Sequence, residues 1–203
     1  MTLRFLVLGD SLAYGTGAAS AQDTLGARLS RALTAAGHDV RTDVVAVPGA
    51  TSLDLAGQVR RAPRDADVAL LVVGANDLTH QVAPARGSAA LGAAVAELTG
   101  RGTDVLVLPT PDLSSVAWVP AAFRSVVAAV CAQQRALQTA AVDAAGGVVA
   151  PVAPELSARF AADPALFSAD RFHPSSAGYA HIAQALVPHV VAAAHARRDG
   201  AAA

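Results

Sequence analysis

Arg-Phe-Leu-Val-Leu at residues 4–8 runs directly into Gly-Asp-Ser-Leu at residues 9–12. A short, continuous apolar run of this kind is typical of a strand buried in a parallel sheet. Gly9 ends the run, so Ser11 is expected at the carboxyl end of a strand, where open α/β sheets bind their ligands. A glycine and a serine after a strand usually only form a turn, and the interpretation therefore depends on the rest of the chain.

Apolar segments of strand length alternate with segments of helical spacing along the whole chain. After residues 4–8, further strands are predicted at residues 40–47, 68–73, 105–108 and 147–150. Helices are predicted at residues 22–36 (with Ser20 and Asp23 placed like a capping box), from Thr51, and at 87–98, 121–145 and 175–196. Residues 13–21 and 151–169 are expected to be loops, the second with one helical turn at most. This alternation predicts an α/β fold in which one sheet of five parallel strands has helices on both faces.

Composition limits what kind of protein this is. A length of 203 residues suits one domain, which we place at residues 1–196, followed by a frayed tail at 197–203. The net charge is -1 and no basic run is present, so a nucleic-acid partner is not expected. No stretch has the length and apolarity of a membrane span, and no signal peptide precedes the first strand, which predicts a cytoplasmic protein unless a leader has been removed. Nothing in the sequence indicates an oligomeric state.

Three predicted strand ends share a glycine close to a hydrogen-bonding group. They are Gly9 with Ser11, Gly49, and Gly74 with Asn76. Just before the last predicted helix, the chain reads Asp170-Arg-Phe-His173-Pro. Residues three apart on a turn can meet, so Asp170 can bind one ring nitrogen of His173 and leave the other facing outward. A serine, a histidine oriented by a carboxylate, and donors for an oxyanion are the groups that acyl transfer needs.

The order of these segments resembles that of the SGNH hydrolases, the esterase and lipase family also named after its GDSL motif. Gly9-Asp10-Ser11-Leu12 resembles the first block of the family, and Gly49 the second. Gly74-Ala75-Asn76-Asp77 resembles the third block and Asp170-x-x-His173 the fifth. One departure is Ala75, where the family commonly has a second glycine. The resemblance implies a flavodoxin-like three-layer αβα sandwich.

The resemblance also implies a role for each matching residue. Ser11 would be the nucleophile, His173 the general base and then acid, and Asp170 the group that orients His173. The backbone N–H groups of Ser11 and Gly49, with the side-chain amide of Asn76, would form the oxyanion hole. The substrate would be a small ester, and no cofactor is implied. Losing one oxyanion donor costs roughly 100- to 1,000-fold in rate at comparable sites.

Other polar residues near these segments have simpler interpretations. Asp10 and Asp77 are expected to tie down their own loops through hydrogen bonds to the backbone. Asp112 also follows a strand but has no histidine near it in sequence, so Asp170 is preferred as the carboxylate. His80 is expected to be a loop residue. The remaining histidines (38, 181, 189 and 195) lack ligand spacing with an acidic residue or with Cys131, so no metal site is predicted.

Three alternatives compete with an SGNH-type serine esterase. The α/β-hydrolase fold places its nucleophile after several strands, whereas Ser11 follows the first, so that fold is excluded by position. A flavodoxin-like module that binds FMN or phosphate through residues 11–17 would leave Asp170 and His173 without a role. An acyltransferase would use the same catalytic residues, and the sequence leaves it open.

The substrate pocket is expected among the loops that follow the first, third and fourth strands. These loops contain few large apolar residues, and the candidates are Leu12, Tyr14, Leu78, Val82, Leu113 and Trp118, with Phe172 beside the base. Each methylene of a buried acyl chain is worth about 0.8 kcal/mol, so long chains need an extended apolar surface. The sequence therefore predicts a preference for short acyl groups.

Overall fold

The computed structural model of the chain describes residues 2–201, and within them five parallel strands form one sheet in the order β2-β1-β3-β4-β5. This is the strand order of flavodoxin-like folds, and the predicted α/β class is confirmed. The strands are β1 (Thr2–Gly9), β2 (Asp39–Val44), β3 (Val68–Val72), β4 (Asp104–Leu108) and β5 (Val148–Val149).

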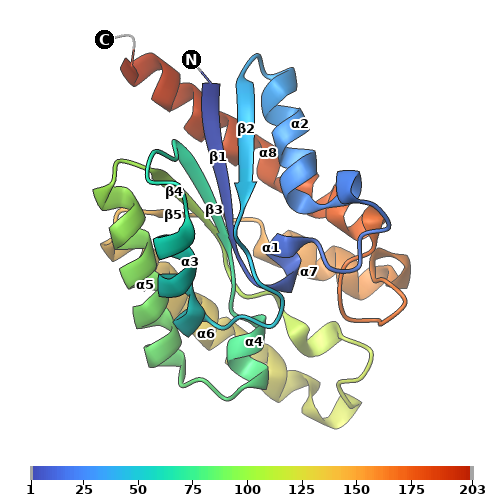
Figure 1. The fold of residues 1–203 in the computed structure, drawn as a ribbon. Helices are drawn as coiled ribbons and strands as arrows, with labels where there is room; N and C mark the ends of the chain where they lie inside the picture. Colours follow the sequence, from blue (N-terminus) through green and yellow to red (C-terminus); the bar gives the residue numbers. More distant parts are fainter. Residues whose placement is uncertain (1, 202–203) are drawn as a thin grey trace.

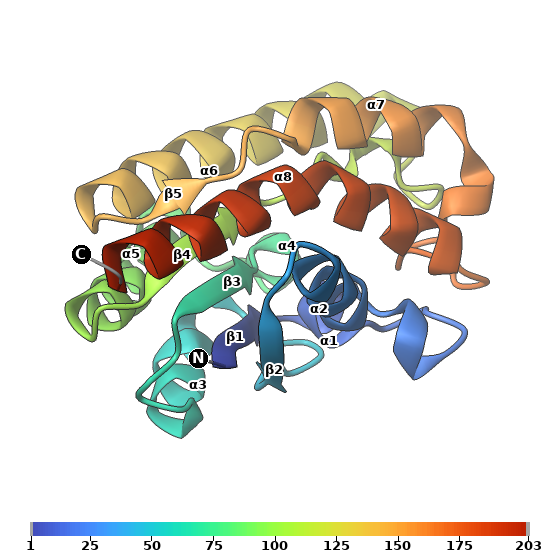
Figure 2. The ribbon, with the colours of Figure 1, turned by 90° about the horizontal axis from the view of Figure 1, so that it is seen from above.

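Helices cover both faces of this sheet, as Figures 1 and 2 show. One face carries α2 (Leu25–Ala35) and α8 (Ser176–Ala201), with α7 (Ala153–Ala162) packed against α8. The other face carries α3 (Leu55–Arg61), α5 (Pro84–Gly100) and α6 (Arg124–Ala144). Successive side chains of a strand point to opposite faces, so Phe5 and Val7 enter one core while Leu6 and Leu8 enter the other. Burial on both faces explains why β1 is a continuous apolar run.

Two very short helices begin where central strands end. Helix α1 (Ser11–Tyr14) follows β1, and α4 (Ala75–Thr79) follows β3. Ala75 is the first residue of α4 and does not have a positive φ, so it does not need to be a glycine. The remaining elements are the 3-10 turns η1 (Ala21–Asp23), η2 (Ser52–Asp54), η3 (Leu113–Ser115), η4 (Ala121–Phe123) and η5 (Pro164–Leu166).

Four sequence expectations need correction. Residues 153–162 form the ten-residue helix α7 rather than a loop, because Pro154 lies in the first turn, where it favours a helix start. Residues 11–14 form the short helix α1, although residues 13–21 were expected to be a loop. Helix α2 begins at Leu25 with Thr24 as its N-cap, rather than at residue 22, and Ser20 bonds Asp23 within the preceding turn. Helix α8 continues to Ala201, through most of the expected tail, and the last two residues of that tail lie outside the described part of the chain.

Between residues 2 and 201, none of the helices is long and apolar enough to cross a membrane.

Candidate active site

Gly9 brings the start of α1 against the tip of the neighbouring strand. Its φ of +130° is unfavourable for a residue with a side chain, and a Cβ there would lie 1.8 Å from the carbonyl oxygen of Val72 in β3. The next residue, Asp10, caps α1 by accepting the N–H of Leu12 at 2.9 Å. Ser11 is therefore held between β1 and β3, where the strand order reverses and ligands bind in this class of sheet.

Ser11, His173 and Asp170 form a continuous chain of hydrogen bonds. The hydroxyl oxygen of Ser11 lies 3.0 Å from Nε2 of His173, and Nδ1 of His173 lies 2.6 Å from Oδ2 of Asp170. The serine is buried, the histidine half-buried and the carboxylate 46% exposed. This is the geometry in which a histidine can remove a proton from a serine while a carboxylate fixes its tautomer.

Asp170 is held as a carboxylate by several donors. Its Oδ1 accepts the backbone N–H groups of Phe172 and His173 and the hydroxyl of Ser168. Partial burial raises the pKa of this carboxyl, but the hydrogen bond to His173 and these three donors outweigh it and hold the pKa well below its ordinary value. Asp170 is therefore negatively charged throughout the neutral range.

The His173 segment is 162 residues from Ser11 in sequence and is held against it by close packing. A Cβ on Gly17 would lie 2.5 Å from the carbonyl oxygen of Pro174 and 3.0 Å from Cβ of His173, so only a glycine lets the two segments approach this closely. The hydroxyl of Tyr179, which is fully buried, donates to the carbonyl oxygen of Thr16 at 2.8 Å. Burial raises the pKa of Tyr179, and the nearby carboxylates of Asp10 and Asp170 add to the rise.

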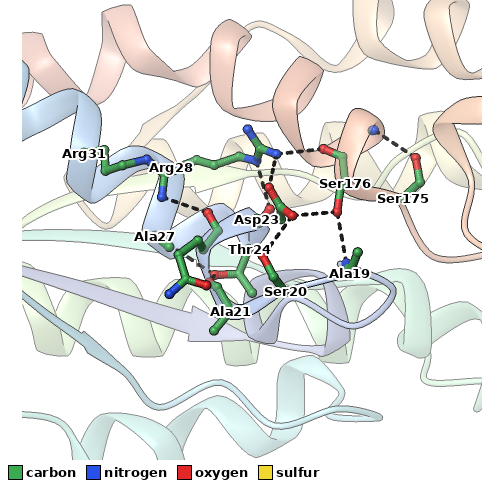
Figure 3. A network of polar contacts seen from close by, with 12 residues as sticks. Ala19, Ser20, Ala21, Asp23, Thr24, Ala27, Arg28, Arg31, Ser175 and Ser176 are labelled. Carbon is green, nitrogen blue, oxygen red and sulfur yellow. Dashed lines mark hydrogen bonds and ion pairs between the residues drawn. The ribbon is translucent and has the colours of Figure 1, made fainter.

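A polar network ties the start of α8 to the loop after α1 and to α2 (Figure 3). The hydroxyl of Ser176 accepts the N–H of Ala19 at 3.0 Å and donates to Oδ2 of Asp23 at 3.1 Å. Arg28 donates to the carboxylate of Asp23 at 2.6 Å and to the carbonyl oxygen of Ser176 at 3.1 Å. Hydrogen bonds from Ser20 and Ser176 lower the pKa of Asp23. The network fixes the position from which His173 reaches Ser11.

The three expected oxyanion donors lie at the ends of three adjacent strands. Ser11 opens α1, and the first N–H groups of a helix have no acceptor within it. Gly49 is exposed in the loop after β2, and Asn76 lies in α4. One hydrogen of the Asn76 amide bonds the carbonyl oxygen of Ala50 at 2.9 Å, which fixes the side chain beside the Gly49 loop. The second hydrogen of the same NH₂ group remains available for a ligand.

Two buried carboxyl groups support these donors. Asp77 accepts both the N–H and the hydroxyl of Ser52, at 2.7 and 2.6 Å, and so joins α4 to the turn that follows Gly49. Asp10 is buried beneath Ser11, and burial, together with the nearby charge of Asp77, raises its pKa to about 7. Both residues tie down their loops, as the sequence analysis expected.

A set of buried glutamines holds the strand ends, and this role was not predicted from the sequence. Gln58 donates to the carbonyl oxygen of Gly9 and accepts its N–H, each at 2.8 Å. Gln138 binds Val73 and Thr110, and Gln134 donates to the carbonyl oxygen of Gly74 at 3.0 Å. In the sequence, these glutamines are recognisable only by their inward positions on helices α3 and α6. Such a position does not reveal which strand end the side chain binds.

An apolar pocket opens beside Leu12, the residue after Ser11, between the loop after β4, α7 and the segment around His173. Its volume is about 90 Å³. Three of the expected residues line it, namely Leu12, Leu113 and Phe172, and Phe160 and Phe167 add aromatic surface. The other expected residues, Tyr14, Leu78, Val82 and Trp118, are not among its lining, and Tyr14 and Trp118 are each 56% exposed.

The remaining candidate groups make none of the hydrogen bonds that link Ser11, His173 and Asp170. Asp112 accepts the N–H of Ser114 and lines the apolar pocket, and His80 is exposed at the end of α4. Cys131 is buried in α6, and burial raises its pKa. The N–H groups of Tyr14, Gly15 and Thr16 bond carbonyl oxygens of Asp10 and Ser11, which leaves them unavailable to a phosphate. Among the described residues, no group of three or more His, Cys, Asp or Glu side chains could hold a metal ion.

Comparisons with known proteins show which family of sequences this chain resembles. The model of the GDSL-like lipase/acylhydrolase family matches residues 7–181. GDSL-like esterase Rv1075c of Mycobacterium tuberculosis (strain ATCC 25618 / H37Rv) is 36% identical over 189 residues, which are 91% of this chain and 60% of that protein. This chain therefore spans less than two thirds of that relative.

Solved structures of low identity share the fold. LAE5, an alpha/beta hydrolase enzyme from the metagenome of Lake Arreo, Spain, superposes with a TM-score of 0.75 at 20% identity, covering 94% of this chain and 98% of its own. Axe2, an acetylxylan esterase from Geobacillus stearothermophilus, superposes with a TM-score of 0.72 at 18% identity, covering 93% and 94%.

Proposed function

Because the chain belongs to the GDSL-like lipase/acylhydrolase family, we propose that it is a serine esterase that hydrolyses carboxylic esters of short acyl chains. The observation that carries the proposal is the chain of contacts from Ser11 through His173 to Asp170, at 3.0 and 2.6 Å. A related esterase that is 36% identical supports the same reaction class.

The reaction proceeds in two halves. Nε2 of His173 takes the hydroxyl proton of Ser11 as Oγ attacks the ester carbonyl, and the charge that forms on the carbonyl oxygen is stabilised by the N–H groups of Ser11 and Gly49 and by the amide of Asn76. His173 then gives its proton to the leaving alcohol, and an acyl group remains on Ser11. Water, deprotonated by His173, releases the acid in the second half. Asp170 stays ionised and holds Nδ1–H of His173 throughout.

The apolar pocket beside Leu12 supports the preference for short acyl groups. Its volume of about 90 Å³ is far below the roughly 300–1,000 Å³ of pockets that take drug-sized ligands. Phe160, Phe167 and Phe172 border it, and the Phe160 and Phe167 rings meet edge to face at 5.1 Å. We therefore assign the pocket to acyl groups from acetyl to about butyryl.

A panel of p-nitrophenyl esters from acetate to decanoate tests both parts of the proposal. We expect kcat/KM to peak between acetate and butyrate, and Ser11→Ala to lower it roughly 10,000-fold or more while circular dichroism shows an intact fold. A rise in kcat/KM up to decanoate would contradict the short-chain preference alone. A Ser11→Ala variant with a tenth of the activity would remove Ser11 from the mechanism. Adding an acceptor alcohol and measuring the ester formed separates hydrolysis from acyl transfer.

A further inference from the structure

An open cleft of about 780 Å³ lies between the loop after β2 and helix α3. Residues 47–50 form one wall, and residues between Leu53 and Arg61 form the other. It shares no lining residue with the apolar pocket beside Leu12, so it is a separate site, and its size is within the range of pockets that hold small organic ligands. We call it the arginine cleft, because Arg60 and Arg61 both line it.

The two guanidinium groups of the arginine cleft lie over the same glycine. A Cβ on Gly57 would lie 3.6 Å from Nη1 of Arg61 and 3.7 Å from Nη2 of Arg60. The two arginines follow Gly57 by three and four positions, and residues at these spacings are neighbours on one helix face. Two positive charges are therefore close together, and an anion between them would remove their repulsion.

Neither guanidinium group has a partner among residues 2–201. No carboxylate of these residues lies within ion-pair distance of Arg60 or Arg61, and neither side chain donates a hydrogen bond to them. Cations in the last turn of a helix commonly bind its free carbonyl oxygens. At the end of α3, Arg101 has this role instead, because it donates to the carbonyl oxygen of Val59 at 3.2 Å. Arg60 and Arg61 are thus not used to complete the helix.

The carboxylate that lines the arginine cleft is occupied elsewhere. Oδ2 of Asp54 accepts both the N–H and the hydroxyl of Thr51, each at 2.8 Å. The lining residues therefore carry two positive charges and one negative charge, and the negative charge pairs with neither arginine. The balance of charge in the cleft favours an anionic ligand.

The two guanidinium groups favour a phosphate over a carboxylate. One guanidinium group is enough to bind both oxygens of a carboxylate as a fork. A phosphate monoester has three acceptor oxygens and a charge of about -1.5 to -2 at pH 7, so it can engage two guanidinium groups at once. Val47 and Leu53 line the same cleft and are 43% and 36% exposed, which provides apolar surface for a carbon skeleton.

We propose that the arginine cleft binds a small organic phosphate, with the phosphate group between Arg60 and Arg61 and the carbon skeleton against Val47 and Leu53. The proposed proton transfers use none of these residues, so the inference goes beyond the proposed function. It assigns a ligand class to a cleft whose two cations have no other role in the fold.

The arginine cleft extends to the loop that holds a proposed oxyanion donor. Gly49 and Ala50 line it, and the carbonyl oxygen of Ala50 accepts the amide of Asn76 at 2.9 Å. An organic phosphate can therefore come from two sources. It can be part of the alcohol half of the ester, or it can be a separate molecule that binds beside the oxyanion loop.

Titration calorimetry of the full chain with phenyl phosphate tests binding without any need for catalysis. We expect a dissociation constant below about 1 mM at low ionic strength, because both guanidinium groups make charge-assisted hydrogen bonds. Added salt should weaken binding, because exposed charges are screened. Arg60→Gln with Arg61→Gln keeps hydrogen-bond donors but removes both charges, and we expect it to weaken binding at least about tenfold.

Matched controls separate the cleft from general positive charge. Arg86→Gln with Arg159→Gln removes the same charge from two exposed arginines outside the cleft and should bind phenyl phosphate as the parent does. Phenylacetate, which has a carboxylate in place of the phosphate, should bind the parent at least about fivefold more weakly. Circular dichroism and urea unfolding check that both double variants are folded.

Two acetate esters distinguish the sources of the phosphate. 2-Phosphonooxyethyl acetate and 2-hydroxyethyl acetate differ only in the phosphate, and acetate release gives kcat/KM for each. A preference of at least about tenfold for the phosphorylated ester, lost in Arg60→Gln with Arg61→Gln, would place the phosphate on the alcohol half of the substrate. Equal values for the two esters, with phenyl phosphate still bound through the two arginines, would assign the cleft to a separate phosphorylated molecule.

Four results would overturn the proposal. They are no heat of binding with phenyl phosphate up to about 10 mM, undiminished binding in Arg60→Gln with Arg61→Gln, an equal loss of binding in the control double variant, and phenylacetate that binds as tightly as phenyl phosphate. Absence of hydrolysis of every ester would contradict the proposed function and leave the calorimetric result standing.

Discussion

His173 connects the two groups that the proposed mechanism depends on, because its two ring nitrogens have different partners. Nδ1 faces the carboxylate of Asp170 at 2.6 Å, and Nε2 faces the hydroxyl of Ser11 at 3.0 Å. A carboxylate at Nδ1 places the proton there and leaves Nε2 free to accept one. The three donors on Oδ1 of Asp170 keep the carboxylate ionised and fix its angle to the ring. The order of proton transfers follows from these contacts.

Asp170→Asn tests whether Asp170 orients His173, and Asp112→Asn is the matched control. The new NH₂ group would face Nδ1 of His173 and favour the tautomer whose Nε2 carries the proton and cannot accept another. We expect kcat/KM on p-nitrophenyl butyrate to fall at least about 100-fold. Asp112→Asn, which changes a carboxylate that lines the apolar pocket, should stay within a few-fold of the parent. If Asp112→Asn were the more damaging change, the carboxylate of the mechanism would be Asp112.

At the scale of elements, the proposed oxyanion donors depend on how α4 is joined to the turn after Gly49. Asp77 makes this connection through two hydrogen bonds to Ser52, and Asn76 adds a third through Ala50. The donors must match the position of the oxygen in the transition state, so a shift of either segment lowers the rate of the chemical step more than substrate binding.

Asp77→Asn is expected to lower kcat about tenfold to hundredfold with little change in KM. An amide replaces one acceptor by a donor, which faces the Nε2 group of Gln134 at 3.4 Å and loosens the contact with Ser52. The control is Asp54→Asn, in the exposed capping box of the same turn, where it bonds Thr51 and not Asp77, and this change should leave kcat unchanged. A rise in KM at constant kcat would show that Asp77 acts on substrate binding instead.

The contact between Gly17 and the His173 segment gives a second prediction at this scale. Gly17→Ala adds a Cβ that would lie 2.5 Å from the carbonyl oxygen of Pro174, so we expect His173 to be displaced and kcat/KM to fall at least about tenfold. Gly37 has a similar φ of +90° and no neighbour within 4 Å of an added Cβ. Gly37→Ala should therefore cost about 1 kcal/mol of stability and keep its activity. Equal losses of activity in both variants would attribute the effect to general destabilisation.

The elements also show what the sequence could predict. The strands, their parallel arrangement and the glycine-marked strand ends followed from local apolar runs and their alternation with helices, because burial on both faces leaves a strong local pattern. Helix α7 was not predicted within residues 151–169, although Pro154 lies in its first turn, where a proline favours a helix start. The exposure of Trp118 could not be predicted, because it depends on how η3 and η4 are placed relative to the sheet.

The proposed site also combines contacts that could be predicted from the sequence with contacts that could not. The approach of Asp170 to His173 is a local contact between residues three apart, and it could be expected from spacing. The contacts of Gln58 with Gly9 and of Gln134 with Gly74 join residues 49 and 60 positions apart. No local pattern specifies such pairs, because they depend on which helix covers which strand end.

For the whole molecule, the burial of Asp10 predicts an unusual dependence of stability on pH. Its pKa is raised to about 7, so the folded state keeps a proton that the unfolded chain releases near pH 4. The free energy of unfolding should therefore fall as the pH rises from about 4 to 7, by about 1.4 kcal/mol per pH unit from this group. The lowered pKa values of Asp23 and Asp170 act in the opposite direction, because their stabilisation is lost as the pH falls through those values.

Comparing Asp10→Asn with the parent protein isolates this effect, because the other carboxylates contribute equally to both. Urea unfolding at several pH values should show the stability of the variant rising relative to the parent by a few kcal/mol between pH 4 and pH 7 and by nothing further above pH 8. A constant difference over the whole range would show that the pKa of Asp10 is the same in the folded and the unfolded protein.

The central claim is that Ser11, activated by His173, forms the covalent acyl intermediate. Treating the whole protein with a phosphonofluoridate and mapping the label by mass spectrometry tests this most directly, because such reagents trap an activated serine. We predict one phosphonyl group per chain on the peptide that contains Ser11, loss of esterase activity in proportion to labelling, and labelling at least about 100-fold slower in His173→Ala. A label on another residue, or full activity after Ser11 is labelled, would contradict the account.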